Sequence, residues 1–253
     1  MLRAGACQTP ELLSDVPAAL AVVESFADQA PGVDLLLFPE CFLQGYLTTG
    51  DHLARTAYEL GSPEFGEILA RLAPLRQTLV LGLIERDGSR FFNSAVVITR
   101  GEVTGVYRKT HLTPGEQTFT AGAAYPVFDL NGVRFGINIC YDTRFPAAAK
   151  AVAAQGAQVL FVPSQNMMGR AKAELWQPRH NAIRGERARE TGMWLISADV
   201  TGERGAGRIG LGPTSVIRPD GVVVAQVPLH TVGMVKAEVG GRARGPCRTE
   251  SRA

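Results

Sequence analysis

The sequence predicts an α/β protein built in layers, and three kinds of observation support this fold class. Several short apolar runs have the length of buried strands. Segments between some of these runs repeat apolar residues at helical spacing, as helices do when they bury one face. One stretch of strand character turns back as a hairpin, so the sheet is not wholly parallel. With 45% hydrophobic and 20% charged residues, the 253-residue chain is globular rather than disordered.

The strand predictions follow from the apolar runs. The runs LLLF at 35–38 and QVLFV at 158–162 are continuous, as in a sheet that is covered on both faces. Residues 90–109 read as the hairpin, with its turn at Arg100 and Gly101. In chain order, the apolar runs predict strands at 2–8, 34–38, 78–84, 133–139, 158–162, 193–198, 214–218 and 222–227.

The helix predictions rest on periodicity and on one proline. Residues 15–30 place apolar side chains on one face, namely those of Leu20, Val23, Ala27 and Ala30. Pro146 opens the predicted helix at 146–155, because the first turn of a helix does not use the N–H that proline lacks. We expect further helices at 63–73 and 171–191, the second of them long and charged.

Composition and charge exclude several classes of protein. Lys plus Arg (26) against Asp plus Glu (24) gives a net charge of +2, without the basic stripe of a nucleic-acid-binding protein. No apolar run is long enough for a transmembrane helix, and the N-terminus does not resemble a signal peptide, so we expect a cytoplasmic protein. We expect a single domain over 1–253, in which the tail at 241–253 lacks apolar residues and is mobile.

Cysteine spacing gives no framework for a structural zinc site or a disulfide scaffold. The cysteines form no CxxC pair and are treated as individual thiols: Cys7, Cys41, Cys140 and Cys247. Cys140 is the most informative of them, because in VRFGINICYDTRFP (133–146) it lies between a strand and a helix. A helix N-terminus and nearby backbone amides lower the pKa of a thiol, which suits a nucleophile. The same fragment equally fits a core cysteine that ends a strand.

Two further fragments carry charged residues after strands. Glu40 follows the run LLLFP, and Lys109 follows the second strand of the hairpin. Glu116 lies seven residues beyond Lys109, past a Pro-Gly turn. Taken alone, Glu40 reads as a surface carboxylate, and Lys109 and Glu116 read as a solvated pair.

Taken together, these fragments resemble the nitrilase superfamily of carbon–nitrogen hydrolases. The matching motifs are LLLFPECFLQGY, YRKTHLTPGEQTFTAG and GINICYDTRFP, and the resemblance continues through 156–164, 186–202 and 212–227. It therefore covers nearly the whole chain in the expected order. The resemblance implies a four-layer α-β-β-α sandwich, a homodimer or larger homo-oligomer, and a small-molecule amide substrate, with neither a metal nor an organic cofactor.

The resemblance also implies a mechanism. Cys140 is the expected nucleophile, and Glu40 the general base that later delivers its proton to the leaving ammonia or amine. Lys109 and the backbone N–H of Tyr141 are expected to stabilise the oxyanion, after which a thioester acyl-enzyme is hydrolysed. Glu116 matches the second glutamate of the family, which positions the substrate and Lys109.

The substrate is less well defined by the motifs. Tyr141-Asp142 after the cysteine looks more like the amidase branches, including those acting on deaminated glutathione or on ω-amides of dicarboxylic monoamides, than like nitrilases proper. The stretch 164–178 does not match those branches well, and within it Gln165, Asn166 and Met167 are candidate substrate-binding residues. A nitrilase and an N-carbamoyl amine or amino acid amidohydrolase remain alternatives. A non-enzymatic binding module is disfavoured, because it should have lost one of the three catalytic residues.

Two other patterns offer competing interpretations. GAGRIG at 205–210 fits GxGxxG, but the strand-like segment GPTSVIRP follows it where a dinucleotide site needs a helix. We therefore expect a flexible loop there. His111 lies two residues after Lys109 and could form a papain-like dyad with Cys140. The resemblance favours Glu40 as the base, with His111 as a structural neighbour.

Overall fold

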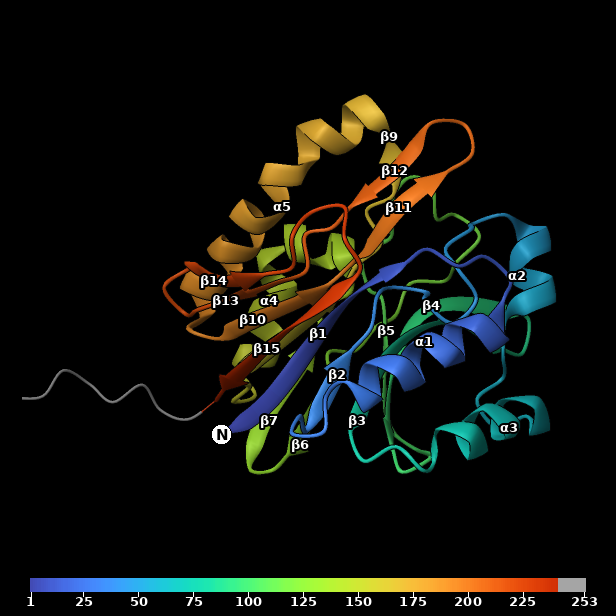
Figure 1. Cartoon of the computed structure of the whole chain (residues 1–253), viewed down its shortest axis with the longest axis horizontal. Helices are drawn as coiled ribbons and strands as arrows, with labels where there is room; N and C mark the ends of the chain where they lie inside the picture. The colour runs from blue at the N-terminus through green and yellow to red at the C-terminus, as the bar shows by residue number, and fades with distance from the viewer. Residues whose placement is uncertain (241–253) are drawn as a thin grey trace, which may run out of the picture.

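Two β-sheets pack face to face between two layers of helices in the computed structural model, which describes residues 1–240 (Figure 1). The four-layer α-β-β-α sandwich implied by the resemblance is therefore confirmed. The predicted tail at 241–253 lies outside the described residues. Within residues 1–240, no helix is long and apolar enough to cross a membrane.

The first sheet has nine strands in the order β5-β4-β3-β2-β1-β11-β12-β9, with β15 also paired to β1. Strands β1, β2 and β3 are parallel, whereas β4 and β15 run antiparallel to their neighbours. The strands are β1 (Leu2–Pro10), β2 (Leu35–Leu37), β3 (Thr78–Asp87), β4 (Arg90–Thr99), β5 (Glu102–Arg108), β9 (Met168–Gly169), β11 (Val200–Arg204), β12 (Arg208–Leu211) and β15 (Gly233–Val239).

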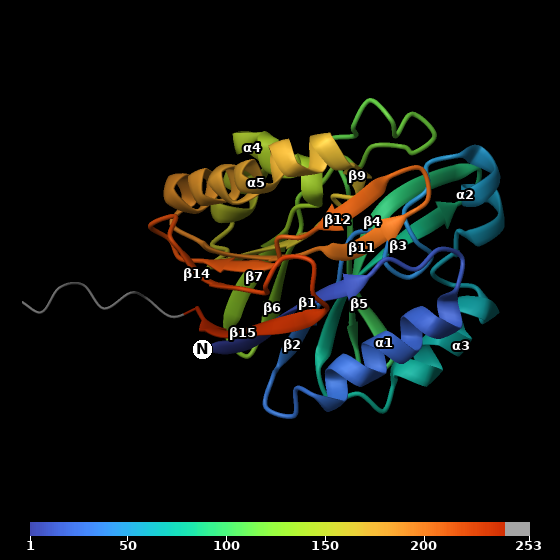
Figure 2. The ribbon, with the colours of Figure 1, turned by 45° about the horizontal axis from the view of Figure 1, so that its top comes forward.

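The second sheet has six strands in the order β14-β13-β10-β8-β7-β6, and its central strands β7, β8 and β10 are parallel. They are β6 (Val127–Leu130), β7 (Val133–Ile137), β8 (Val159–Pro163), β10 (Trp194–Ala198), β13 (Ser215–Ile217) and β14 (Val223–Gln226). Helices α1 (Val16–Asp28) and α3 (Pro63–Leu72) cover the first sheet, and α4 (Pro146–Ala153) and α5 (Arg170–Thr191) cover the second (Figure 2).

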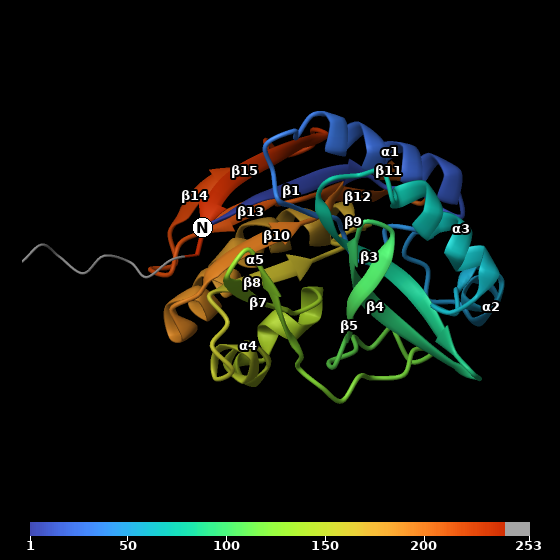
Figure 3. The same ribbon diagram turned by 90° about the horizontal axis from the view of Figure 1, so that it is seen from below.

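Three apolar layers hold the sandwich together. The middle layer lies between the sheets, where the rings of Phe135 and Phe161 meet edge to face at 5.2 Å. An outer layer joins α1 and α3 to the first sheet, and another joins α4 and α5 to the second (Figure 3). Central strands such as β2 and β8 are therefore buried on both faces, which explains why runs such as LLLF lack alternation.

The predicted strands and helices are present, with ends that differ by a few residues. The hairpin turn at Arg100 and Gly101 is confirmed, and both residues have positive φ (53° and 76°), as a type I′ turn requires. The expectation of a loop at 205–210 is wrong in part, because Arg208–Leu211 forms β12 and pairs with β11. The short helix α2 (Gly50–Thr56) and strands β6, β9, β11 and β15 were not predicted.

The topology places the ends of several strands at one edge of the sandwich. Because β5 is antiparallel to β4, and β4 to β3, β5 runs in the same direction as β2 and β3. The backbone N–H of Glu40, just after β2, donates to the carbonyl of Ser164, just after β8 (3.3 Å). The carboxyl ends of strands from both sheets thus meet here, as they do at many ligand sites in α/β proteins.

Candidate active site

Cys140 begins a short 3₁₀ helix, η1 (Cys140–Arg144), three residues after the end of β7. Its backbone has φ of 44°, a conformation that costs free energy for a residue with a Cβ and that is found at functional sites. The residue is partly exposed and lines a cavity of about 640 Å³. The fold therefore presents this sulfur to a ligand instead of packing it in the core.

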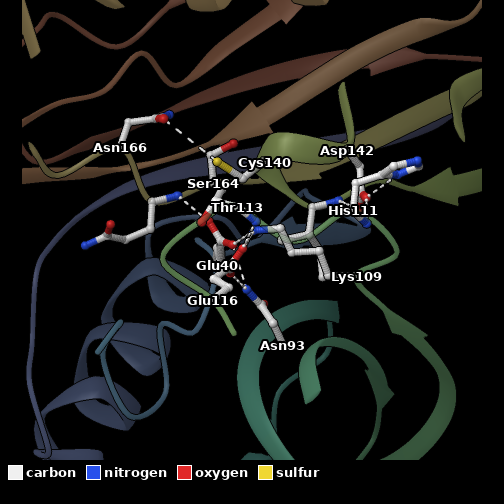
Figure 4. A network of polar contacts seen from close by, with 12 residues as sticks. Glu40, Asn93, Lys109, His111, Thr113, Glu116, Cys140, Asp142, Ser164 and Asn166 are labelled. Atoms are coloured by element: carbon white, nitrogen blue, oxygen red, sulfur yellow. Dashed lines mark hydrogen bonds and ion pairs between the residues drawn. The ribbon is translucent and has the colours of Figure 1, made fainter. Parts of the chain in front are cut away.

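Glu40, Lys109 and Glu116 form a buried ionic cluster (Figure 4), and Glu40 and Lys109 line this cavity. Lys109 Nζ lies 2.6 Å from Glu40 Oε1 and 2.9 Å from both carboxylate oxygens of Glu116. All three side chains are at most 1% exposed. The structure thus brings together residues that are far apart in the sequence, and it excludes the solvated pair as an interpretation of Lys109 and Glu116.

Hydrogen bonds fix the geometry of the two carboxylates. Asn93 on β4 donates from Nδ2 to Glu40 (2.7 Å) and to Glu116 (2.9 Å). The backbone N–H of Gln165 donates to the second oxygen of Glu40 at 3.0 Å, and that of Thr113 to Glu116 at 2.7 Å. Each carboxylate is therefore held by several donors, which restricts how it can turn.

The environment drives the pKa values of the two glutamates apart. Burial raises the pKa of Glu40, and the nearby charge of Glu116 raises it further, against the opposing effects of Lys109 and Asn93. Burial also opposes ionisation of Glu116, but Lys109 and the N–H of Thr113 outweigh it and lower the pKa of that carboxyl. A pair separated in this way suits different roles, with Glu40 better able to exchange a proton.

The expected lowering of the Cys140 pKa is wrong. Burial raises the pKa of this thiol well above its usual value, and the charge of Glu40 adds to the effect. Helix α4 begins at Pro146, so Cys140 does not lie at its N-terminus. The free thiol is therefore protonated at neutral pH, and its reaction as a thiolate requires a base close by.

Asp142 connects the turn that carries Cys140 to the loop that carries Lys109. It accepts hydrogen bonds from Tyr107 Oη (2.7 Å), from the N–H and Nδ1 of His111 (2.8 and 3.1 Å), and from the N–H of Ile139 (2.9 Å). The His111 ring also stacks on Phe145 at 3.8 Å. His111 thus faces Asp142, and within residues 1–240 the thiol of Cys140 is hydrogen-bonded to Asn166 instead (3.8 Å).

Tyr107→Phe should weaken this connection without altering the cavity. Tyr107 is fully buried, and the change removes the hydroxyl that donates to Asp142, at an expected cost of about 1–3 kcal/mol in the free energy of unfolding. Urea denaturation measures this loss, with Tyr58→Phe as the control for a ring outside the network. A free energy of unfolding equal to that of the parent protein would contradict the proposed anchoring.

The candidate substrate-binding residues lie in the wall of the cavity. Gln165, Asn166 and Met167 follow β8 and line it together with Trp176 of α5. The Gln165 side chain, however, donates to Glu11 at 2.6 Å, so its backbone is what contacts Glu40. Tyr141, whose backbone N–H was expected to bind an oxyanion, also lines the cavity.

Several polar residues of the site were not singled out from the sequence. Asn93 interrupts an apolar strand, and Asp199 directly follows the apolar run WLISA. Arg184 lies on α5 and is 3% exposed. A polar side chain inside an apolar run must find partners when it is buried, and this signal could have identified Asn93 and Asp199.

Comparisons with known proteins define the class to which this fold and site belong. The model of the carbon-nitrogen hydrolase family matches residues 3–245, and the chain belongs to this family. It is 32% identical over 203 residues to an (R)-stereoselective amidase from Pseudomonas sp., covering 80% of this chain and 72% of the amidase. It is 34% identical over 178 residues to a nitrilase from Pyrococcus abyssi, covering 68% of this chain and 64% of the nitrilase.

Solved structures agree with this assignment. The NitN amidase from Nesterenkonia sp. AN1 superimposes with a TM-score of 0.83 at 26% identity, over 95% of this chain and 93% of that one. Variants of that amidase have been solved with acrylamide added at the active-site cysteine and with butyramide bound. The resemblance to the nitrilase superfamily is confirmed: the protein is an enzyme, a carbon–nitrogen hydrolase of the amidase-like type.

Proposed function

We propose that this enzyme hydrolyses small linear amides to acids, through a thioester on Cys140. This proposal is supported above all by the buried cluster of Glu40, Lys109 and Glu116, because Glu40 and Lys109 line the same cavity as Cys140. Because burial raises the pKa of the thiol, the thiol needs a base. The pKa of Glu40 is raised towards neutral pH, which suits a carboxyl that must both accept and release a proton.

In the acylation step, Glu40 takes the proton of the Cys140 thiol while Sγ bonds to the amide carbon. The carbonyl oxygen becomes an oxyanion, and Lys109 and the backbone N–H of Tyr141 stabilise its charge. Glu40 then gives its proton to the amide nitrogen, the C–N bond breaks, and ammonia or an amine leaves. Glu116 accepts hydrogen bonds from the ammonium group of Lys109 and holds that side chain in place.

In the deacylation step, a water molecule replaces the amine. Glu40 takes a proton from the water as its oxygen attacks the thioester carbon, and Lys109 again stabilises the oxyanion. The C–S bond breaks, the acid is released, and the proton on Glu40 returns to the sulfur. The same carboxyl therefore acts as base and as acid in both halves of the reaction.

Ammonia release from matched substrates tests the substrate class. Butyramide, N-carbamoyl-β-alanine and butyronitrile are compared at one enzyme concentration, with Cys140→Ala as the blank. The bound butyramide of the Nesterenkonia amidase supports beginning with a short aliphatic amide. Faster release from the carbamoyl compound or the nitrile would move the enzyme to one of those classes.

Lys109→Met should lower kcat by about 10²–10³-fold, because the charge that meets the oxyanion is lost. Lys109→Arg should also fail, since a planar guanidinium does not reproduce a compact ammonium between two carboxylates. Steady-state kinetics with butyramide measures the effect, and circular dichroism checks the fold, because Lys109→Met leaves two buried carboxylates without their counter-ion. Parent-like activity of the arginine variant would rule out the assigned role.

We further propose that the enzyme works in the cytoplasm as a homodimer or larger homo-oligomer. Cys7, Cys41 and Cys140 are all free thiols, and a reducing compartment preserves them. Size-exclusion chromatography with light scattering measures the oligomeric state.

A further inference from the structure

A three-residue segment, 164–166, touches both the base and the nucleophile. The Ser164 carbonyl accepts from the N–H of Glu40 (3.3 Å), and the N–H of Gln165 donates to the Glu40 carboxylate (3.0 Å). The thiol of Cys140 lies 3.8 Å from Asn166 Oδ1 (Figure 4). This segment therefore fixes where the two groups lie relative to each other.

Asp199 sets the orientation of the Asn166 side-chain amide. Asn166 donates to Asp199 twice, from Nδ2 at 2.5 Å and from its backbone N–H at 3.0 Å. A carboxylate accepts hydrogen bonds, so the amide nitrogen must face Asp199 and the amide oxygen must face Cys140. Asp199 thus determines that Asn166 presents an acceptor, and not a donor, to the reacting atoms.

Burial raises the pKa of Asp199, and the neighbouring charge of Arg184 opposes this effect. Its guanidinium lies 3.6 Å from Asp199 Oδ2 and donates to Ser164 Oγ at 2.9 Å. Asp199 is fully buried and Arg184 nearly so, and a buried carboxylate remains charged where a partner offsets its desolvation. The pair supports both ends of the segment, through Ser164 and through Asn166.

We propose that Asn166 Oδ1 recognises the N–H of the substrate amide, and that Asp199 and Arg184 are positioning residues for it. In the tetrahedral adduct the amide nitrogen is two bonds from Sγ, so when the adduct turns this nitrogen towards Asn166, an acceptor 3.8 Å from Sγ comes within hydrogen-bond reach of it. An ester oxygen and a nitrile nitrogen carry no hydrogen. They cannot donate to Asn166 Oδ1, which then has no hydrogen bond from the substrate. The site therefore favours amides over their ester and nitrile analogues.

This proposal rests on the proposed function, and an amide and an ester of the same acid test it separately. Butyramide and methyl butyrate give the same butyryl thioester, so kcat/KM compares their acylation steps alone. Asn166→Leu should lower kcat/KM for butyramide about 10-fold or more relative to methyl butyrate, because a buried hydrogen bond to the amide is lost. Asn166→Ser, which shortens the side chain, should shift this ratio in the same direction and serves if the leucine variant does not fold.

Asn181→Leu is the matched control. Asn181 lies on α5, bonded to Gln226 and Ser215 away from the cavity, so the amide-to-ester ratio should remain that of the parent. Asp199→Asn, whose side chain can donate as well as accept, no longer fixes the Asn166 amide and should lower the ratio too. An equal fall for both substrates, or no fall, would overturn the proposal while leaving the amidase function intact. If the parent enzyme releases no ammonia from any amide, the proposed function itself fails.

Discussion

Cys140→Ala is expected to reduce amide turnover to the uncatalysed background, a loss on the order of 10⁶-fold in kcat. Among residues 1–240, Cys140 is the one cysteine that lines the cavity, and the small alanine side chain leaves the turn intact. Ammonia release measures the loss, and thermal unfolding checks that the fold persists. Cys7→Ala is the control: Cys7 is a fully buried thiol in the core layer under α1 and should retain parent activity.

Alkylation identifies the same residue independently. Iodoacetamide should modify Cys140 first, because Cys7 and Cys41 are fully buried and Cys140 lines the cavity. Cys247 lies outside the described residues, so the experiment uses a Cys247→Ser background. Butyramide should protect Cys140, because a bound substrate occupies the cavity that this thiol lines. An active Cys140→Ala variant, together with first labelling of Cys41, would refute the assignment.

The strand and helix pattern could be predicted because each long element has a recognisable local pattern of apolar or turn residues. Continuous apolar runs such as 35–38 and 158–162 need both faces buried, and the turn at Arg100 and Gly101 needs positive φ. The face-to-face packing of two sheets could not be worked out from such signals, because no local pattern states which runs meet. The resemblance supplied that step. Short strands such as β9, which has two residues, are defined by their pairing with a neighbouring strand, here β12, and have no sequence pattern of their own.

The candidate catalytic residues could be predicted from the sequence, whereas the network that holds them could not. Glu40, Lys109 and Cys140 each follow a strand and lie in a recognisable motif. Asn93, Asp199 and Arg184 have no such motif. The fold brings Asn93 onto the buried carboxylates of Glu40 and Glu116, and it brings Arg184 of α5 next to the buried carboxylate of Asp199. The pKa of Cys140 was mispredicted for the same reason, since burial by the surrounding chain outweighs the local backbone amides.

A comparison of the activities of the Glu40→Gln and His111→Asn variants decides whether a carboxylate or an imidazole is the base. Glutamine keeps the shape of Glu40 but cannot take the thiol proton, so kcat for butyramide should fall by about 10²–10⁴-fold or more. His111 binds Asp142 and stacks on Phe145, so His111→Asn should affect stability more than turnover. Steady-state kinetics and thermal unfolding separate the two effects.

Glu85→Gln controls for the loss of a buried carboxylate as such. Glu85 is 3% exposed, pairs with Arg108 and accepts from Ser94, outside the cavity. Its replacement should lower the unfolding temperature and leave kcat close to that of the parent. If Glu85→Gln lost as much activity as Glu40→Gln, the effect of Glu40 would be structural.

An activated ester then resolves the two half-reactions of the Glu40→Gln variant. The p-nitrophenolate of p-nitrophenyl butyrate leaves without a proton, so the acylation defect should shrink while thioester hydrolysis, which needs Glu40 to activate water, stays slow. The butyryl group should therefore accumulate on Cys140, and mass spectrometry should find it there. Under the imidazole alternative, Glu40→Gln would deacylate rapidly and His111→Asn would be inactive. The contacts of His111 with Asp142 and Phe145, and of Glu40 with Lys109, favour the carboxylate.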